Sequence, residues 1–370
     1  MSRALVTGSD GFIGRRVADL LKREGHDVLT YDVDDPGALL SEHVAKADFI
    51  FHFAGVNRPP DPAEFENVNA NLTEKLCDLA SHAGTNPVVV LASSTQALLD
   101  NPYGVSKRHA EKAVEQFAKN GGRALIFRLP NVFGPGCRPN YNSAVATFAH
   151  NTARGLPLEI HDPARELTLV YVHDVASAML GVLETPPTSG KAAFRDVSPV
   201  ARTTLQDLAT TLEGYRQSRS NAATPAVSDE FGRKLYATYL SYLTPDDFSY
   251  DLTARTDERG ALAEFLKSAT AGQLFISRTR PGAVRGNHYH HTKTEKFFVV
   301  EGKGMIRFRR VDGTGEVLEY LVRGADFRVV DIPPDYTHSI ENVGAGELVV
   351  LFWASEIFDP DAPDTLPLKV

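Results

Sequence analysis

The first half of the chain alternates short apolar runs with segments of helical periodicity. The apolar runs that we interpret as buried parallel strands are 3–7, 27–31, 48–53, 88–92 and 123–128. Helical spacing of apolar positions lies between them, most clearly over 65–83 and 104–118. Strands that alternate with helices in this way form a parallel sheet with helices on both faces. The pattern therefore predicts a doubly wound α/β domain.

The pattern changes in the second half, where glycine or proline separates most of the short apolar runs. The strands expected here are 273–279, 296–300, 304–309, 318–322, 327–332 and 348–353. This spacing predicts an all-β domain, either a barrel or a jelly roll. A polar, alanine-rich stretch at 218–228 and a turn at 245–247 separate the two patterns. We therefore divide the chain into an α/β domain of residues 1–244 and an all-β domain of residues 245–370.

Composition narrows the classes of function that the chain can have. The 370 residues are 42% hydrophobic, which is enough for two or three cores. The net charge of −8 argues against a nucleic-acid partner, and no apolar stretch is long enough to predict membrane insertion. The first residues are too weakly apolar for a signal peptide, and two cysteines do not make a disulfide framework. We therefore expect a cytoplasmic protein.

A glycine-rich turn follows the first strand directly and precedes a helix. The run is Gly8-Ser9-Asp10-Gly11-Phe12-Ile13-Gly14. Glycines in this context allow a tight turn and a close approach to a pyrophosphate at the helix N-terminus, so we predict a dinucleotide site. The small residues Ala54 and Gly55, which follow the third strand, would let the cofactor lie close to the backbone. The candidate cofactor contacts are Gly8, Gly11, Phe12, Ile13, Gly14, Arg15, Asp32 and Ala54.

Two signals conflict on which dinucleotide binds. Asp32 ends the second strand, where an acid usually bonds the adenosine ribose and disfavours a 2′-phosphate. Arg15 and Arg16 follow the glycine turn, where arginine can hold that phosphate. We place NADPH first and keep NADH as the alternative.

The stretch from Ser93 to Lys107 contains a candidate acid–base pair. Tyr103 and Lys107 are four residues apart, so both lie on one helix face. A lysine ammonium beside a phenol would lower the pKa of the tyrosine and suit it to proton transfer near neutral pH. The hydroxyls of Ser94 and Thr95 could hold a substrate oxygen beside it. The alternative is a surface Tyr and Lys on an ordinary helix.

The all-β half contains a candidate metal site. His288 and His290 are two residues apart, so on a strand they share a face, and Glu295 is close enough to return through a turn. His338 supplies a third imidazole. Three histidines and one carboxylate are a common ligand set for Zn, Fe, Mn or Ni. The alternative is a histidine-rich polar strand that binds no metal. Neighbours that are candidates for a proton-abstracting base are His291, Lys293, Lys296 and Tyr336.

Residues 1–240 together resemble the extended short-chain dehydrogenase/reductases that act on nucleotide sugars, which have a Rossmann-type fold. The motifs that carry this likeness are the glycine turn, Ser93-Ser94-Thr95, the Tyr103/Lys107 pair, 128–136 and 171–176. The resemblance implies that Thr95 supplies the catalytic hydroxyl, with Ser94 as the fallback. It also implies that Tyr103 donates the proton and that Lys107 activates it and anchors the cofactor ribose. Asn131 would then contact the substrate near its diphosphate.

The second half resembles the cupins, because both histidine motifs have matching spacing, although Asp335 stands where glycine is common. That resemblance implies a divalent metal held by His288, His290, Glu295 and His338, with zinc as the first choice. The order of the two domains is similar to that of the bifunctional epimerase/reductases of capsular polysaccharide synthesis, over nearly the whole chain. The stretches 138–143 and 286–293 are particularly close, which implies that Arg138 and Asn142 contact the substrate.

This likeness implies two reactions on a UDP-sugar in a homodimeric enzyme. The cupin would invert C3 of a UDP-4-keto-6-deoxy-N-acetylhexosamine, and the first domain would reduce C4 with NAD(P)H. The product would be UDP-N-acetyl-6-deoxy-L-talosamine, a precursor of N-acetyl-L-fucosamine. One alternative is a single-function reductase, epimerase or dehydratase with a structural or dimerising cupin. Gln96-Ala97 offers no acid–base pair for a dehydratase. The other alternative is a catalytically inert sugar-binding protein.

Overall fold

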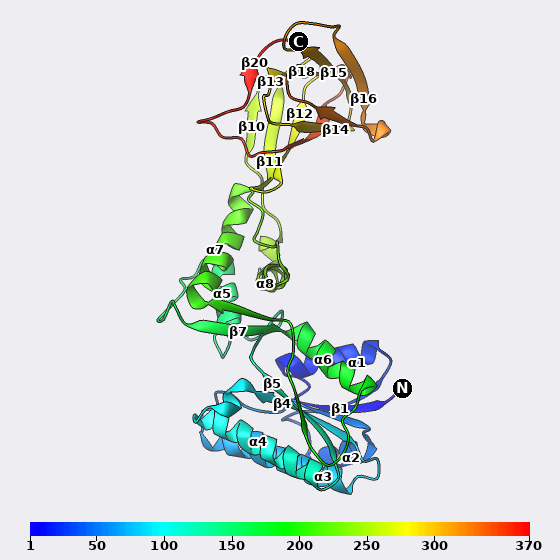
Figure 1. The fold of residues 1–370 in the computed structure, drawn as a ribbon, viewed down its shortest axis with the longest axis vertical. Helices are drawn as coiled ribbons and strands as arrows, with labels where there is room; N and C mark the ends of the chain where they lie inside the picture. Colours follow the sequence, from blue (N-terminus) through cyan, green and yellow to red (C-terminus); the bar gives the residue numbers. More distant parts are fainter. The chain divides into compact units, whose positions relative to one another are not determined.

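A computed structural model describes all 370 residues, which form two compact units (Figure 1). One unit comprises Met1–Glu213 and Val227–Thr244, and the other comprises Gly214–Ala226 and Pro245–Val370. We expected a single boundary between residues 244 and 245. The stretch Gly214–Ala226 precedes that boundary but belongs with the second unit.

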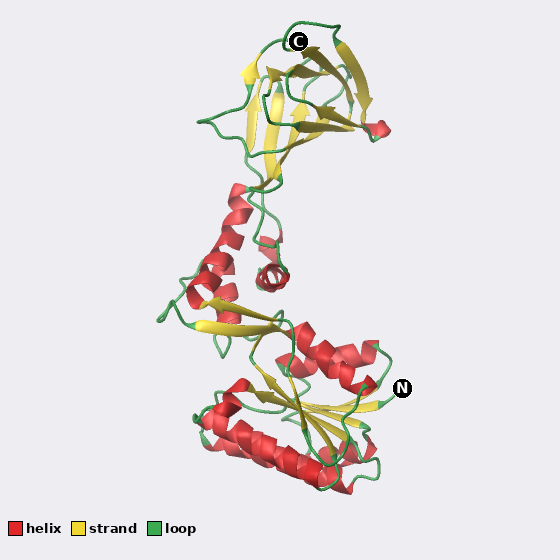
Figure 2. Ribbon diagram, in the orientation of Figure 1, coloured by secondary structure: helices red, strands yellow, loops and turns green.

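The first unit is built on a six-stranded parallel sheet, so the predicted doubly wound α/β fold is confirmed (Figure 2). The strand order is β2-β1-β3-β4-β5-β8. The strands are β1 (Arg3–Thr7), β2 (Asp27–Tyr31), β3 (Phe49–His52), β4 (Val88–Ser94), β5 (Arg123–Leu129) and β8 (Ala193–Arg195). The chain changes direction across the sheet between β1 and β3, and the carboxyl ends of such neighbouring strands are where these sheets bind ligands.

Helices cover both faces of this sheet and form two cores. The helices of one core are α1 (Phe12–Arg23) and α6 (Val172–Glu184), and those of the other are α2 (Gly37–Lys46), α3 (Leu72–His82) and α4 (Pro102–Lys119). Side chains of β1 alternate between them: Ala4 and Val6 join the first core and Leu5 joins the second. The helix expected over 65–83 is divided, because Phe65–Asn71 forms a π-helical segment, η1, before α3 begins.

The remaining elements of the first unit surround a small second sheet. Its strands are β6 (Asn131–Phe133), β7 (Glu166–Tyr171) and β9 (Val200–Thr204). The helices beside it are α5 (Ala144–Ala153) and α8 (Glu230–Leu240), which pack on each other. A 3-10 turn, η2 (Thr95–Leu98), joins β4 to the loop before α4, and α7 spans Leu205–Asn221. None of the helices combines the length and apolar character that crossing a membrane would require.

The second unit consists of two antiparallel sheets around one core, so the predicted all-β architecture of the cupin or jelly-roll type is also confirmed. The larger sheet contains β10 (Ala254–Asp257), β11 (Gly260–Ser268), β12 (Gly272–Thr279), β19 (Leu348–Ala354), β14 (Glu295–Glu301) and β17 (Val329–Ile332). The other contains β16 (Leu318–Arg323), β15 (Lys303–Arg310), β18 (Tyr336–Asn342), β13 (Val284–Tyr289) and β20 (Leu366–Pro367). Short turns η3 (Pro245–Phe248) and η4 (Gly324–Asp326) complete the unit.

One expected strand of this unit begins later than predicted. The run 327–332 reads as continuous strand, but β17 starts only at Val329. Phe327 ends turn η4 with a φ of 45°, in the left-handed region, which is incompatible with strand geometry. The hydrophobic pattern alone does not reveal this turn.

Candidate active sites

The glycine turn between β1 and α1 leaves no room for side chains at two positions. Gly8 has a φ of +66°, and a Cβ there would lie 2.7 Å from the backbone nitrogen of Ala54. A Cβ on Gly14 would lie 2.1 Å from the carbonyl oxygen of Gly8. The turn is therefore closed tightly against the end of β3, and Phe12 and Ile13 begin α1 immediately after it. This arrangement fits a dinucleotide pyrophosphate at the N-terminus of α1.

Asp32 and Arg15 both bond the backbone of Asp10 in the glycine turn. The Asp32 carboxylate accepts hydrogen bonds from the backbone N–H groups of Asp10, at 2.7 Å, and Val33, at 2.8 Å. The Arg15 guanidinium donates to the carbonyl oxygen of Asp10 at 3.0 Å. The acid that favours a ribose hydroxyl and the cation that favours a phosphate thus both lie at this end of the predicted site. The geometry supports a dinucleotide without separating NADPH from NADH.

Lys107 lies at the carboxyl end of β4 and is only 7% exposed. Its ammonium donates a hydrogen bond of 2.9 Å to the carbonyl oxygen of Ala92. A Cβ on Gly55 would lie 3.6 Å from this ammonium and 2.8 Å from Oδ1 of Asn69, so glycine keeps the space beside Lys107 open. Burial lowers the pKa of Lys107 to about 8, although the nearby Glu111 opposes that shift. A positive charge is therefore held beside a space that a cofactor ribose can enter.

The expected lowering of the Tyr103 pKa is wrong in this structure. Burial raises the pKa of Tyr103, and a hydrogen bond with the Ser94 side chain only partly offsets this effect. The physical reason is the burial of the phenol, and the Lys107 ammonium donates its hydrogen bond to the Ala92 carbonyl. The Tyr103 ring packs on Phe65, with 6.1 Å between ring centroids. Tyr103 therefore keeps its proton at neutral pH, which suits a proton donor.

The two candidate hydroxyls differ in their surroundings. Ser94 is the last residue of β4 and is 9% exposed, and its hydroxyl accepts from the backbone N–H of Gln96 at 3.1 Å. It also lies close enough to the Tyr103 side chain to lower the pKa of that phenol. Thr95 begins turn η2 and is exposed to solvent. Ser94, the fallback residue, is therefore the hydroxyl that affects the pKa of Tyr103, and the catalytic roles of Ser94 and Thr95 stay predictions.

The three candidate substrate residues lie in the segment that follows β5. Asn131 begins β6, and its amide donates to the carbonyl oxygen of Thr168 at 3.3 Å. The Arg138 guanidinium lies 5.2 Å from the centroid of the Tyr141 ring. Asn142 is exposed. No hydrogen bond joins any of the three to Tyr103 or Lys107, so their part in binding stays a prediction.

The four candidate metal ligands of the second unit converge. His288 on β13 pairs with His338 on β18, His290 follows the end of β13, and Glu295 begins β14. One ligand atom from each lies within 4.8 Å of all the others. The Nε2 atoms of His290 and His338 lie 3.5 and 3.3 Å from the Glu295 carboxylate, yet both are buried without a hydrogen-bond partner. Buried imidazole nitrogens left open toward a carboxylate fit a divalent cation.

The charges of this cluster also suit a cation. Burial and the neighbouring His338 lower the pKa of His288 to about 4, so its imidazole is neutral at physiological pH. Burial raises the pKa of Glu295, but the adjacent His290 and His338 side chains lower it by more, so it falls below its usual range. Neutral imidazoles and an ionised carboxylate are the protonation states that metal binding needs.

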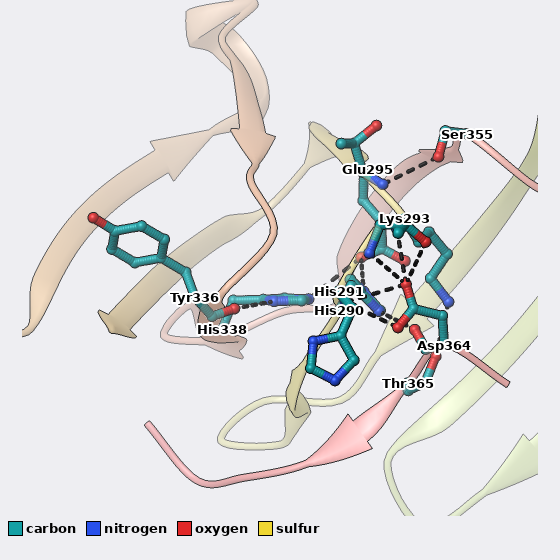
Figure 3. Close-up of polar contacts among 11 residues, drawn as sticks. His290, His291, Lys293, Glu295, Tyr336, His338, Ser355, Asp364 and Thr365 are labelled. Atoms are coloured by element: carbon teal, nitrogen blue, oxygen red, sulfur yellow. Dashed lines mark hydrogen bonds and ion pairs between the residues drawn. The ribbon is translucent and has the colours of Figure 1, made fainter. Parts of the chain in front are cut away.

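In two of the candidate ligands, the imidazole nitrogen Nδ1 contacts a backbone carbonyl oxygen (Figure 3). Nδ1 of His290 lies 2.5 Å from the carbonyl oxygen of Asp364, and Nδ1 of His338 lies 3.3 Å from that of Tyr336. Asp364 is a residue that the sequence reasoning missed. It follows His338 by many residues in an irregular segment, and no motif or periodic pattern marks it.

The four neighbouring candidate bases are not equivalent. Lys293 is 5% exposed and donates to the hydroxyl of Thr365 at 2.8 Å. Lys296 is exposed and forms an ion pair with Asp331. His291 is also largely exposed. Lys293 is therefore the buried candidate of the four, and the Tyr336 ring extends away from the ligands (Figure 3).

Family models match both units of the chain. Residues 4–193 match the NAD dependent epimerase/dehydratase family, and residues 255–366 match the polysaccharide biosynthesis C-terminal domain. The chain is 42% identical over 370 residues to UDP-2-acetamido-2,6-beta-L-arabino-hexul-4-ose reductase from Pseudomonas aeruginosa. That match covers 100% of this chain and 99% of the relative.

Solved structures agree with this assignment. The capsular polysaccharide assembling protein CapF from Staphylococcus aureus superposes with a TM-score of 0.90 at 41% identity, and the match covers 100% of both chains. UDP-glucose 4-epimerase from Thermotoga maritima, solved with UDP-glucose, matches 65% of this chain and 98% of its own with a TM-score of 0.56. At 20% identity this second likeness shows the fold alone. The chain belongs to the NAD dependent epimerase/dehydratase family and carries a polysaccharide biosynthesis C-terminal domain.

Proposed function

We propose that this protein is a bifunctional nucleotide-sugar enzyme. Its first unit reduces the C4 ketone of a UDP-4-keto-6-deoxy-N-acetylhexosamine with NAD(P)H, and its second unit first inverts C3 of that sugar. The observation that carries the proposal is the presence of two sites in one chain: Tyr103 with Ser94 near it in the first unit, and four converging ligands around Glu295 in the second. The Pseudomonas relative named as a reductase of a 4-keto sugar supports this substrate class.

The reduction uses residues at the carboxyl end of β4. Reduced nicotinamide supplies the hydride that the C4 carbonyl carbon accepts. The Ser94 hydroxyl holds the carbonyl oxygen, and the Tyr103 phenol gives that oxygen its proton as negative charge develops there. The Lys107 ammonium, held by Ala92 beside the open space at Gly55, anchors the cofactor ribose. The proton is finally replaced from solvent, which returns Tyr103 to its starting state.

The inversion uses the acidity that the 4-ketone gives to the C3 proton. Removal of this proton leaves an enediolate, and protonation from the opposite face inverts the centre. A divalent cation held by His288, His290, Glu295 and His338 would supply Lewis acidity that favours proton loss beside the ketone. Lys296 is poorly suited as the base, because it is exposed and paired with Asp331. The product of both steps would be UDP-N-acetyl-6-deoxy-L-talosamine.

One observation favours a second candidate function. The name of the Pseudomonas relative states a reductase and no epimerase. A single-function reductase with a structural second unit would fit that name. It predicts turnover of the 4-keto sugar without exchange of the C3 proton.

One assay separates these possibilities. A UDP-4-keto-6-deoxy-N-acetylhexosamine is incubated in deuterated water with NADPH or NADH, nicotinamide oxidation is followed by absorbance, and the product is examined by NMR. Oxidation with deuterium at C3 supports both activities and identifies the preferred cofactor. Oxidation without deuterium supports the plain reductase. Binding without oxidation of either nucleotide contradicts the reductase proposal.

A further inference from the structure

The carboxylate of Asp364 caps the turn that follows the ligand His290 (Figure 3). Its oxygens accept hydrogen bonds from the backbone N–H groups of His291, at 2.9 Å, Thr292, at 2.8 Å, and Lys293, at 2.8 Å. The Thr292 hydroxyl donates to the same carboxylate at 3.1 Å. Hydrogen bonds to an ionised acceptor are about twice as strong as neutral ones. One side chain therefore fixes the backbone of three consecutive residues beside the metal ligands.

The backbone of Asp364 acts on the ligand itself. Its carbonyl oxygen lies 2.5 Å from Nδ1 of His290, so the imidazole carries its proton on Nδ1 and donates it to this carbonyl. That tautomer leaves the Nε2 lone pair free, on the atom that lies 3.5 Å from the Glu295 carboxylate. Partners of this kind orient a metal-binding imidazole and raise its basicity.

The residues that follow Asp364 hold the neighbouring ligand strand. Thr365 accepts from the buried Lys293 ammonium at 2.8 Å. In the antiparallel pairing of β20 with β13, Pro367 lies opposite His288 and Leu366 opposite Tyr289. Loss of the Asp364 cap would therefore release the segment at the point where it meets both His288 and His290.

We propose that Asp364 is a positioning residue for the metal centre, acting through the orientation of His290. The proposal rests on the proposed function, because it assumes that the four converging residues bind a divalent cation. It assigns Asp364 no contact with substrate. Every substitution at position 364 keeps the main-chain carbonyl, so an effect on the metal must arise from displacement of the turn and of His290.

The test measures metal binding by the full-length protein, without turnover. Zinc affinity is measured by competition with a chromophoric chelator, and cobalt absorption reports the coordination geometry. The variants are Asp364→Asn, which keeps the shape but loses the charge, and Asp364→Ala. The matched control is Asp361→Asn, an exposed acid in the same segment with no side-chain partner. Thermal unfolding of each variant without metal shows whether it is folded.

The expected result is about a 10- to 100-fold loss of zinc affinity and an altered cobalt spectrum for Asp364→Asn, with the control unchanged. In a His290→Ala background, the same substitution should cost less affinity than it does alone, since the ligand through which it acts is gone. Wild-type affinity and spectrum in a folded Asp364→Asn protein would overturn the proposal. The proposal would also be overturned if the Asp364→Asn and His290→Ala losses of zinc affinity added in full in the double variant. If the wild-type protein itself binds no zinc or cobalt, the metal centre of the proposed function fails first.

Discussion

The hydroxyl of Ser94, the last residue of β4, lies close enough to the side chain of Tyr103, the second residue of α4, to lower the pKa of that phenol. Thr95, next in the chain, is exposed. We predict that Ser94→Ala lowers kcat of the reduction by about 100-fold, as loss of a positioned donor at a developing oxyanion does. Thr95→Val should change kcat by about twofold or less, as surface substitutions usually do. Steady-state kinetics on both variants checks this. A larger loss in Thr95→Val would return the catalytic role to Thr95.

Removal of the Tyr103 hydroxyl should stop proton donation and leave the ring packing intact. Tyr103→Phe keeps the contact with Phe65, so we expect NADPH affinity and the unfolding midpoint to change little. The rate of reduction should fall by about 100- to 10,000-fold, the usual contribution of a general acid. Stopped-flow absorbance of the nicotinamide measures it. Tyr250→Phe, at a half-exposed tyrosine of the second unit, is the control. A fall of less than tenfold would contradict the role of Tyr103.

Acid should destabilise the first unit through His52. This residue is 1% exposed and lies between the hydroxyls of Thr7, at 2.6 Å, and Thr73, at 3.0 Å. Burial, with a smaller effect of Lys107, lowers its pKa from 6.5 to about 3. Between these values the unfolded chain binds a proton that the folded chain does not. The free energy of unfolding therefore falls as the pH falls from 6.5 toward 3.

The magnitude follows from the same shift. Between pH 6.5 and pH 5, His52 should cost about 2 kcal/mol of the free energy of unfolding. Denaturant unfolding at several pH values measures the slope. His52→Asn should be less stable at pH 7 but lose less stability on acidification, whereas the exposed His82→Asn should keep the wild-type slope. Equal slopes in wild type and His52→Asn would show that His52 titrates normally in the folded state.

Metal should bind to and stabilise the second unit through Glu295. Wild-type protein should bind a divalent ion and unfold at a higher temperature when the metal is added. At a metal concentration of 100 times the dissociation constant, its free energy of unfolding should rise by about 2.7 kcal/mol. Loss of a residue that only supports a metal ligand lowers metal affinity by about 10- to 100-fold. Because Glu295 is itself a candidate ligand, Glu295→Gln should lower metal affinity by more than this. Lys296→Gln, next in the chain but exposed, is the matched control. Elemental analysis and calorimetric unfolding measure both effects. An unchanged metal content in Glu295→Gln would exclude this cluster as the site.

Local spacing predicted the parts of both sites that depend on local geometry. The glycine turn needs only the steric demands of Gly8 and Gly14, and the close spacing of His288 and His290 keeps their rings 5.0 Å apart although β13 ends between them. The order of apolar runs was likewise enough for a parallel sheet followed by antiparallel ones. These features follow from chain periodicity, which the sequence displays directly.

Features that depend on tertiary contacts were not predictable in this way. The different exposure of Ser94 and Thr95 depends on where β4 stops being buried. The pKa of Tyr103 depends on the burial of its side chain, which requires the packing of the folded first unit around it. Asp364 reaches His290 only through the fold of the second unit, because their separation in the chain is 74 residues. No periodic signal marks any of these contacts.

The most direct test of the two-site account compares deuterium exchange at C3 in two variants with the same UDP-4-keto-6-deoxy-N-acetylhexosamine. Tyr103→Phe should incorporate deuterium at C3 with wild-type kinetics while oxidising almost no NADPH. His290→Ala should incorporate none, yet should oxidise NADPH when supplied with the ketone already inverted at C3. Wild-type deuterium incorporation by His290→Ala would contradict the assignment of inversion to the second unit.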